Sequence, residues 1–112
     1  MAKLFVNVVG EDTISAPGNA QVTYVIVSVE DSNGNPVTGL TAANFRLGTE
    51  IVGPGGSISS ISSVVAGSLP GIYRLNIIPL AGQTWKSGVY IHSLAVTRGA
   101  DKGQNVFSFL MD

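Results

Sequence analysis

The stretch QVTYVIVSVE, residues 21–30, decides the fold. It is dense in residues that branch at Cβ, and such side chains are restricted in a helix but suit the pleated surface of a strand. Both sides of its alternation are apolar, which predicts a strand that is central in its sheet or covered on both faces. It runs into DSNGNP, residues 31–36, where Asn33 and Gly34 tolerate positive φ and Pro36 cannot donate to a ladder. We expect a tight turn there, with Asn33 and Gly34 as structural residues.

The rest of the chain repeats this pattern. Val, Ile and Thr make up 30 of the 112 residues, and Gly, Pro, Asn and Ser interrupt them at short intervals. No segment shows a sustained helical period. The sequence predicts a single all-β domain over residues 1–112, with the Ser-rich stretch 58–65 at a sheet edge and one helical turn over 41–44. The seven expected strands are 3–9, 21–30, 45–52, 58–65, 72–78, 89–97 and 105–111.

Composition excludes several classes of function. Charged residues are only 12% of the chain and the net charge is −1, so we expect no nucleic-acid partner. The longest apolar run, residues 25–27, is far below the ~20 residues that a membrane-spanning helix needs, so we expect no membrane insertion. The chain has no Cys and one His. We therefore expect no metal, no cofactor and no enzymatic activity.

The segment KSGVYIH, residues 86–92, resembles the entry to strand F of immunoglobulin-like domains. In those domains a Tyr at the E–F corner stands two residues before a core position, which is Cys in antibodies. Tyr90 and His92 occupy the two positions here. The resemblance implies a seven-stranded immunoglobulin-like antiparallel β-sandwich in which Tyr90 and His92 are structural residues.

Two further segments are similar to the bacterial immunoglobulin-like modules of invasin-type surface proteins. They are residues 29–40, which look like the strand B to C region, and the repeated Gly-x-Tyr steps at 71–73 and 88–90. The resemblance covers residues 20–111. It implies a spacer, adhesin or assembly subunit, and it transfers no binding residue, because the function of such modules comes from their loops and context.

The first residues, 1–3, run directly into the first expected strand without the apolar region of a signal peptide. This predicts a chain that is kept inside a cell or a virion, or an extracellular domain whose signal has been removed.

Two loop motifs resemble ligand sites only in part. Asp31-x-Asn33-x-Asn35 copies the first positions of a calcium loop, but Pro36 stands where that loop needs Gly, so a simple turn is favoured. GPGGS, residues 53–57, lacks the Lys of a phosphate-binding loop, which favours a flexible hairpin or edge loop.

Two candidates for side-chain chemistry are also weak. Lys3 and Asn105 lie on the first and last expected strands, as the joined residues of some bacterial pilin sandwiches do, but no acid partner is recognisable. His92 alternates with apolar strand residues. This pattern favours a hydrogen-bonded core His over a catalytic or metal-binding one.

The sparse charge favours a non-enzymatic structural or interaction module. Residues 51–73 carry no charge at all, although soluble sheets usually protect faces and edges with Lys and Glu. We expect self-association or contact with neighbouring subunits in a filament, pilus-like fibre, phage particle or surface structure.

The alternative is an adhesin-like module that binds carbohydrate or a host surface through loop aromatics, with Trp85 and Tyr73 as binding residues. For Trp85, a cap on the core is favoured over an exposed platform.

Overall fold

The computed structural model describes residues 2–11, 21–56 and 58–111. Strands dominate it, and two single turns of 3-10 helix, η1 (Ala42–Asn44) and η2 (Pro54–Gly56), interrupt them. The seven strands of the described residues are β1 (Phe5–Glu11), β2 (Thr23–Glu30), β3 (Phe45–Ile51), β4 (Ser59–Ala66), β5 (Ile72–Pro79), β6 (Gly88–Arg98) and β7 (Asp101–Met111). Two isolated bridges, Lys3 with Lys102 and Glu30 with Pro36, add to these strands.

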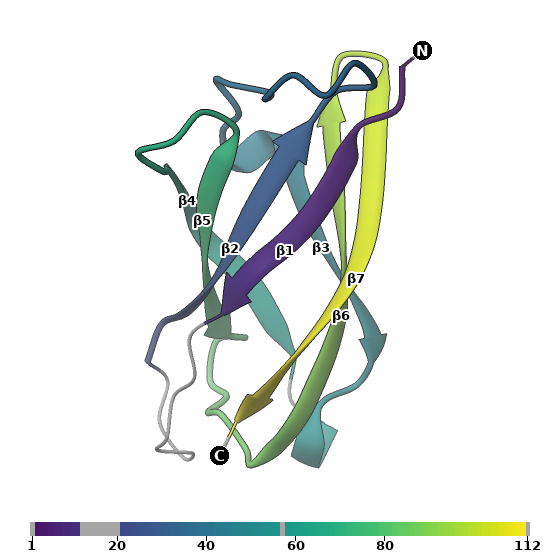
Figure 1. Ribbon diagram of the computed structural model, residues 1–112. Helices are drawn as coiled ribbons and strands as arrows, with labels where there is room; N and C mark the ends of the chain where they lie inside the picture. The colour runs from purple at the N-terminus through teal and green to yellow at the C-terminus, as the bar shows by residue number, and fades with distance from the viewer. Residues whose placement is uncertain (1, 12–20, 57, 112) are drawn as a thin grey trace.

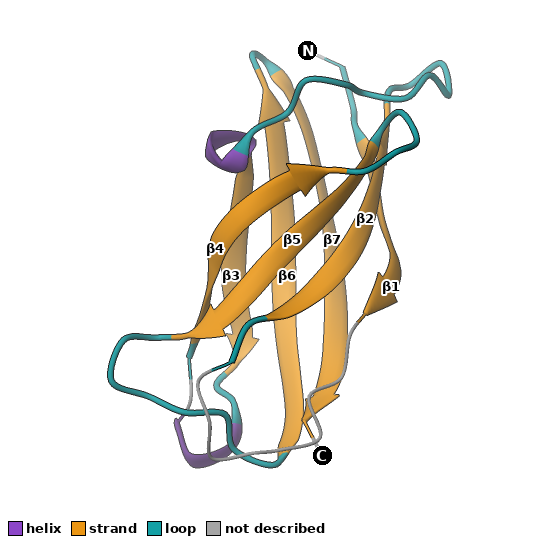
Figure 2. Cartoon of the chain, turned by 90° about the vertical axis from the view of Figure 1, so that its left-hand side faces the viewer, coloured by secondary structure: helices purple, strands orange, loops and turns teal. Residues whose placement is uncertain are grey.

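The strands form two antiparallel sheets that pack face to face. One sheet has the order β1-β2-β5-β4 and the other β3-β6-β7. Figure 2 shows them as two layers, and Figure 1 places the N-terminus and the C-terminus at opposite ends of the molecule. Every strand pairing is antiparallel. The all-β prediction is confirmed.

Individual strand predictions agree with the structure to within a few residues. β2 lies between β1 and β5, as the apolar stretch 21–30 predicts, and β4 is an edge strand, as its Ser-rich sequence predicts. η1 is the expected single helical turn, of 3-10 type, with Thr41 as its N-cap. The largest difference is β7, which begins at Asp101 instead of residue 105, because its full length pairs with β6 through a tight turn at residues 98–101.

The core lies between the two sheets and consists of alternate residues from six strands together with loop residues. β2 contributes Val25, Val27 and Val29, and β6 contributes Tyr90, Leu94 and Val96. Burial of such side chains contributes about 1.5–3 kcal/mol each, which lets the core hold the fold without disulfides. The remaining buried apolar residues are Leu4, Val6, Val37, Leu40, Phe45, Tyr73, Leu75, Ile77, Trp85, Phe107, Phe109 and Met111.

The N-terminal residues join the two sheets. Before β1 pairs with β2, the backbone N–H of Leu4 donates to the carbonyl of Lys102 (2.8 Å), at the start of β7. The approach is very close: a Cβ on Gly103 would lie 2.2 Å from the Leu4 carbonyl oxygen. Gly103 is therefore required by contact between backbones, a role that the sequence does not reveal.

Within residues 2–11, 21–56 and 58–111, no helix is long and apolar enough to cross a membrane.

Candidate interaction surface

Both aromatic residues predicted to bind a ligand are buried. Trp85 is 0% exposed and Tyr73 is 2% exposed. The Trp85 indole N–H donates to the Gln21 carbonyl (2.7 Å), and its ring meets the Tyr90 and Phe109 rings edge to face. The platform interpretation of Trp85 is wrong, because its apolar ring closes one end of the core and its only polar atom bonds to backbone. Tyr73 likewise presents no ring face to a partner.

Tyr90 is buried near the start of β6 and bonds to the loop before it. Its hydroxyl donates to the Lys86 carbonyl (2.9 Å) and accepts from the Lys86 N–H (2.8 Å). The ring stacks on Phe109 at 5.2 Å. One side chain thus fixes the loop before β6 by two backbone hydrogen bonds and anchors it in the core.

His92 is a buried histidine with both ring nitrogens occupied. Its Nε2 lies 2.8 Å from the Ser59 hydroxyl and its Nδ1 lies 3.1 Å from the Gly48 carbonyl oxygen. A carbonyl only accepts, so Nδ1 carries the proton and Nε2 accepts from Ser59. Burial lowers the pKa of His92 below 6.5, and the bond to Gly48 partly opposes this. The prediction of a hydrogen-bonded core His is confirmed.

The Ser59–His92 pair has the atoms of a nucleophile and a base, but its surroundings differ from those of a catalytic pair. Both residues are buried, at 7% and 1% exposure, and the group beyond the imidazole is a backbone carbonyl instead of a carboxylate. The pair lies between the sheets, on β4 and β6. The pair therefore forms a hydrogen bond that holds the two sheets together.

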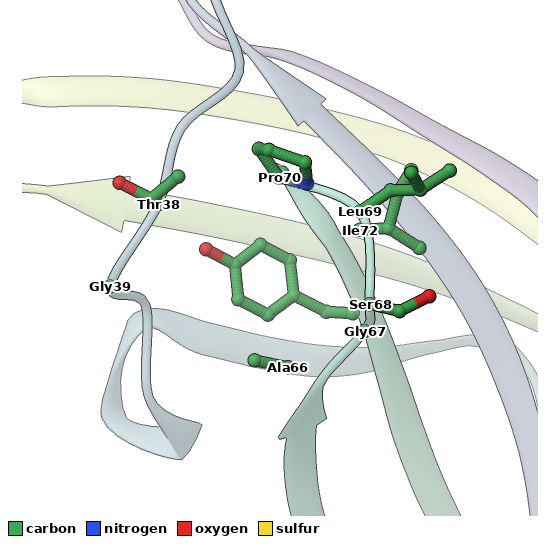
Figure 3. Close-up of a pocket in the computed structure, with 10 residues that line it drawn as sticks. Thr38, Gly39, Ala66, Gly67, Ser68, Leu69, Pro70 and Ile72 are labelled. Atoms are coloured by element: carbon green, nitrogen blue, oxygen red, sulfur yellow. The ribbon is translucent and has the colours of Figure 1, made fainter.

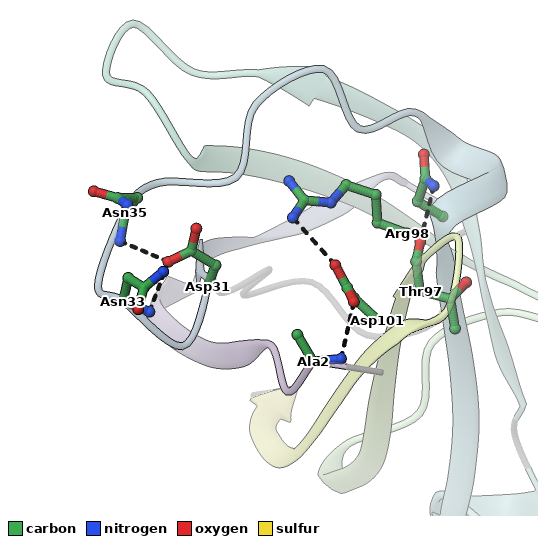
Figure 4. Close-up of polar contacts among 8 residues, drawn as sticks. Ala2, Asp31, Asn33, Asn35, Thr97, Arg98 and Asp101 are labelled. Atoms are coloured by element: carbon green, nitrogen blue, oxygen red, sulfur yellow. Dashed lines mark hydrogen bonds and ion pairs between the residues drawn. The ribbon is translucent and has the colours of Figure 1, made fainter.

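The turn after β2 is held by hydrogen bonds to the Asp31 side chain. One Asp31 carboxylate oxygen accepts from the N–H groups of Asn33 (2.9 Å) and Asn35 (3.0 Å), as Figure 4 shows. Gly34 has φ of +80°, and no described residue other than glycine has positive φ. The predicted turn is present, but Gly34 alone uses the left-handed region. The partial calcium motif is an Asx turn whose carboxylate is engaged by backbone.

Lys3 and Asn105 are not brought together. The Lys3 ammonium lies over the Phe5 ring, 5.4 Å from its centroid, and the Asn105 amide donates to the Val6 carbonyl (2.7 Å). The described residues also contain no cluster of three or more His, Asp or Glu side chains. The two side chains that the cross-link considered from the sequence would join therefore contact other partners.

The Gly-rich loop forms η2, closed by a hydrogen bond from the Gly56 N–H to the Gly53 carbonyl (3.0 Å). Its last residue, Ser57, lies outside the described residues. Gly88 packs against this loop, since a Cβ there would lie 2.4 Å from the Pro54 ring. The loop is a support for the start of β6.

A pocket of about 270 Å3 opens near the turn between β4 and β5. Figure 3 shows Thr38 and Gly39 on one side and Ser68, Leu69 and Pro70 on the other. No charged side chain lines it, and the Tyr73 hydroxyl is engaged with Val37 and Leu40 backbone. The pocket therefore offers apolar contact and the hydroxyls of Thr38 and Ser68, without a charged side chain.

The clearest candidate for an interaction surface is the outer face of the three-stranded sheet. Buried residues alternate along β6 and β7, so the residues between them point away from the core. Val89 lies opposite Leu110, Val106 opposite Ser93, and Ile51 opposite Ile91. Within the described residues the uncharged outer face consists of Gly48, Ile51, Val89, Ile91, Ser93, Ala95, Gln104, Val106, Ser108 and Leu110.

This outer face is apolar where a solvated sheet would be charged. Ile51, Val89, Val106 and Leu110 are each more than half exposed. Arg46 and Lys102 lie beside Ala95 and Thr97, at one end of the face only. Apolar residues occupy both sides of β6, a signal visible in the sequence, but only the register shows that they meet in one patch.

Comparison with protein-family models, with curated proteins and with solved structures finds no match to this chain.

Proposed function

We propose that this chain is a non-enzymatic structural module of immunoglobulin-like fold that associates with copies of itself through the outer face of the β3-β6-β7 sheet. The observation that carries the proposal is the run of uncharged, exposed apolar residues across three strands. Exposed apolar patches of this kind mark interaction sites in soluble proteins. The assemblies that this suits are those in which subunits touch repeatedly, such as a filament, a pilus-like fibre, a phage particle or a surface structure.

The immunoglobulin-like assignment is supported by strand order and by one corner. The sheets β1-β2-β5-β4 and β3-β6-β7 have the order of the ABED and CFG sheets of constant-type immunoglobulin domains. The hydroxyl of Tyr90 bonds back to Lys86, four residues upstream, as in a tyrosine corner. His92 takes the position of the second Cys.

A second copy is the partner that best fits the surface. The face is uncharged except for Arg46 and Lys102 at one end, and the whole chain has a net charge of −1, so two copies meet without strong repulsion. Two copies of one face can also pack about a two-fold axis, which is the commonest symmetry of protein dimers. A charged partner would find no complement among the uncharged residues of the face.

The area of the outer face limits how strongly two copies can associate. Three strands are about 14 Å wide and the uncharged stretch of β6 is about 24 Å long, which gives roughly 340 Å2 per copy. Two copies then bury roughly 700 Å2, below the ~1,000 Å2 at which stable specific interfaces begin. The proposed contact is therefore weak and forms only at high protein concentration.

Carbohydrate binding is not carried forward as a second function. It depended on Trp85 and Tyr73 as exposed rings, and both are buried.

Sedimentation equilibrium over a wide concentration range tests the proposal. The wild type and Val9→Glu are expected to rise in mass with concentration, whereas Val106→Glu loses most of that rise. Val106 and Val9 are matched, at 55% and 58% exposure, and only Val106 lies on the outer face. Equal behaviour of the two variants would contradict the proposal.

A further inference from the structure

We propose that the free edge of β4 is a second self-association site, at which β4 of one copy pairs antiparallel with β4 of another. This inference rests on the proposed self-association and adds a contact that the outer face does not provide. It starts from a comparison of the four strands that end the two sheets, β1, β4, β3 and β7.

Three of these four edges carry protection. β1 and β7 cover each other, because Lys3 bridges to Lys102 and the Asn105 amide bonds to the Val6 carbonyl. β3 carries two exposed charges, Arg46 and Glu50. Charged side chains on an edge oppose pairing with another chain.

The fourth edge, β4, lacks these devices. Its sequence is SSISSVVA, without a charge or a proline, and it lies inside the uncharged stretch 51–73. Among the described residues its only ladder partner is β5. An unpaired strand of this composition exposes backbone N–H and C=O groups as a template for another strand.

The lack of charge on β4 favours a second copy as the partner. When a strand pairs with its own copy around a two-fold axis, side chains near the axis meet the same residues from the other copy. A charge there would oppose itself, whereas Ser and Val do not repel and can bond or pack across the pair. The composition of β4 is thus compatible with symmetric pairing along its whole length.

One irregularity restricts where the pairing takes place. β4 has a bulge between Ile61 and Ser63, and the Ser62 hydroxyl donates to the Asn76 carbonyl of β5 (3.2 Å). Bulges interrupt ladders locally. The regular half, residues 63–66, is the part that we expect to pair.

The two contacts together have a consequence for assembly. A single symmetric contact closes a dimer, whereas two different symmetric contacts on one subunit produce an open chain of subunits. The outer face alone buries too little area for a stable pair. The edge supplies backbone hydrogen bonds at a separate surface, so each subunit can hold two neighbours and the assembly can grow beyond a dimer.

Three matched variants separate the two contacts. Val65 on β4, Val106 on the outer face and Val9 on β1 are 52%, 55% and 58% exposed. Each is replaced by Glu; at position 65 the new carboxylate lies opposite Arg74, which favours correct folding. Val65→Thr is the neutral control, because Thr also branches at Cβ. Ser63→Glu places a negative charge on β4 at a second position.

Sedimentation equilibrium provides the readout, with thermal melts followed by circular dichroism as the folding control. We expect the wild type, Val9→Glu and Val65→Thr to rise past twice the 11.6 kDa monomer mass. Val65→Glu, Ser63→Glu and Val106→Glu are each expected to stop at twice the monomer mass. The double variant Val65→Glu with Val106→Glu is expected to remain monomeric.

The outcomes distinguish the two proposals. If both β4 variants behave as the wild type while Val106→Glu loses mass, the edge proposal is wrong and the outer face stands. A wild type that stops at a dimer contradicts the presence of two contacts, and the variant that abolishes the dimer identifies the one that remains. If Val106→Glu behaves as the wild type while the β4 variants lose mass, the outer face is wrong and the edge stands.

Discussion

Ser59 and His92 share a buried hydrogen bond of 2.8 Å that ties β4 of one sheet to β6 of the other. The same imidazole donates to the Gly48 carbonyl on β3, so three strands meet at one side chain. A neutral His92 accepts this hydrogen bond at Nε2, whereas a protonated Nε2 would donate to the Ser59 hydroxyl, so the direction of the bond depends on the charge of His92. Protonation would also place a charge in the core.

This dependence predicts a pH effect on stability. The folded-state pKa of His92 is lowered below 6.5 by burial, so the unfolded chain binds the proton more readily. The full contribution is present above pH 6.5 and is lost as pH falls through the folded-state pKa. Urea unfolding at about pH 7.5 and about pH 5.5 should show a lower midpoint at the acidic value.

The control is His92→Gln. His92 is the only His in the chain, so the variant is expected to have a flat profile between these two pH values, whatever its overall stability. A wild type with the same midpoint at both pH values would contradict the buried neutral imidazole.

Tyr90→Phe tests the corner before β6. The change removes the hydroxyl that bonds twice to Lys86 and leaves a backbone N–H and carbonyl without that partner. We expect a loss of about 1–3 kcal/mol in the free energy of unfolding. Tyr24→Phe is the matched control, since the Tyr24 ring packs against the Arg74 guanidinium on the sheet surface. Equal losses in the two variants would show that the Lys86 bonds contribute nothing specific.

Gly103→Ala tests the contact between β1 and β7. The added methyl would lie 2.2 Å from the Leu4 carbonyl oxygen, and backbone has to move to admit it. We expect a loss of about 1–3 kcal/mol. Gly10→Ala, whose Cβ would have its nearest atoms at 3.9 Å, should be close to neutral or stabilising. If Gly103→Ala leaves the free energy of unfolding unchanged, the close contact between Leu4 and Gly103 is absent, and residues 2–4 do not lie beside β7.

Trp85 fluorescence tests the position of the only Trp. We expect a blue-shifted emission that acrylamide quenches weakly in the native state and strongly after unfolding, because the ring is fully buried. Native-state quenching as strong as that of the unfolded chain would put Trp85 on the surface and reopen the ligand-binding interpretation.

The sequence predicts the elements of this fold because strand signals are local. The alternation and the turn residues around stretch 21–30 place β2 and its turn, and the Ser-rich composition of β4 marks an edge. The start of β7 is missed, since Lys102 and Gly103 look like loop residues. They become part of a strand only because β6 lies beside them along its full length.

The functional surface is harder to predict because it depends on register. Val106 and Leu110 are ordinary strand residues in the sequence, and only pairing with β6 places them in one patch with Val89.

The aromatic residue of the loop before β6 misleads because a position in a loop suggests an exposed side chain. Trp85 lies in a loop by sequence, but the loop folds back over the core, where the indole finds the Gln21 carbonyl.

A series of 15N–1H correlation spectra over increasing protein concentration tests the central claim most directly, because it locates a weak contact residue by residue. Self-association through the outer face predicts concentration-dependent shifts at the amides of Val89, Ile91, Val106 and Leu110. Residues of the outward side of β2 should remain unchanged. Spectra that stay constant into the millimolar range, or shifts confined to other surfaces, would contradict the claim.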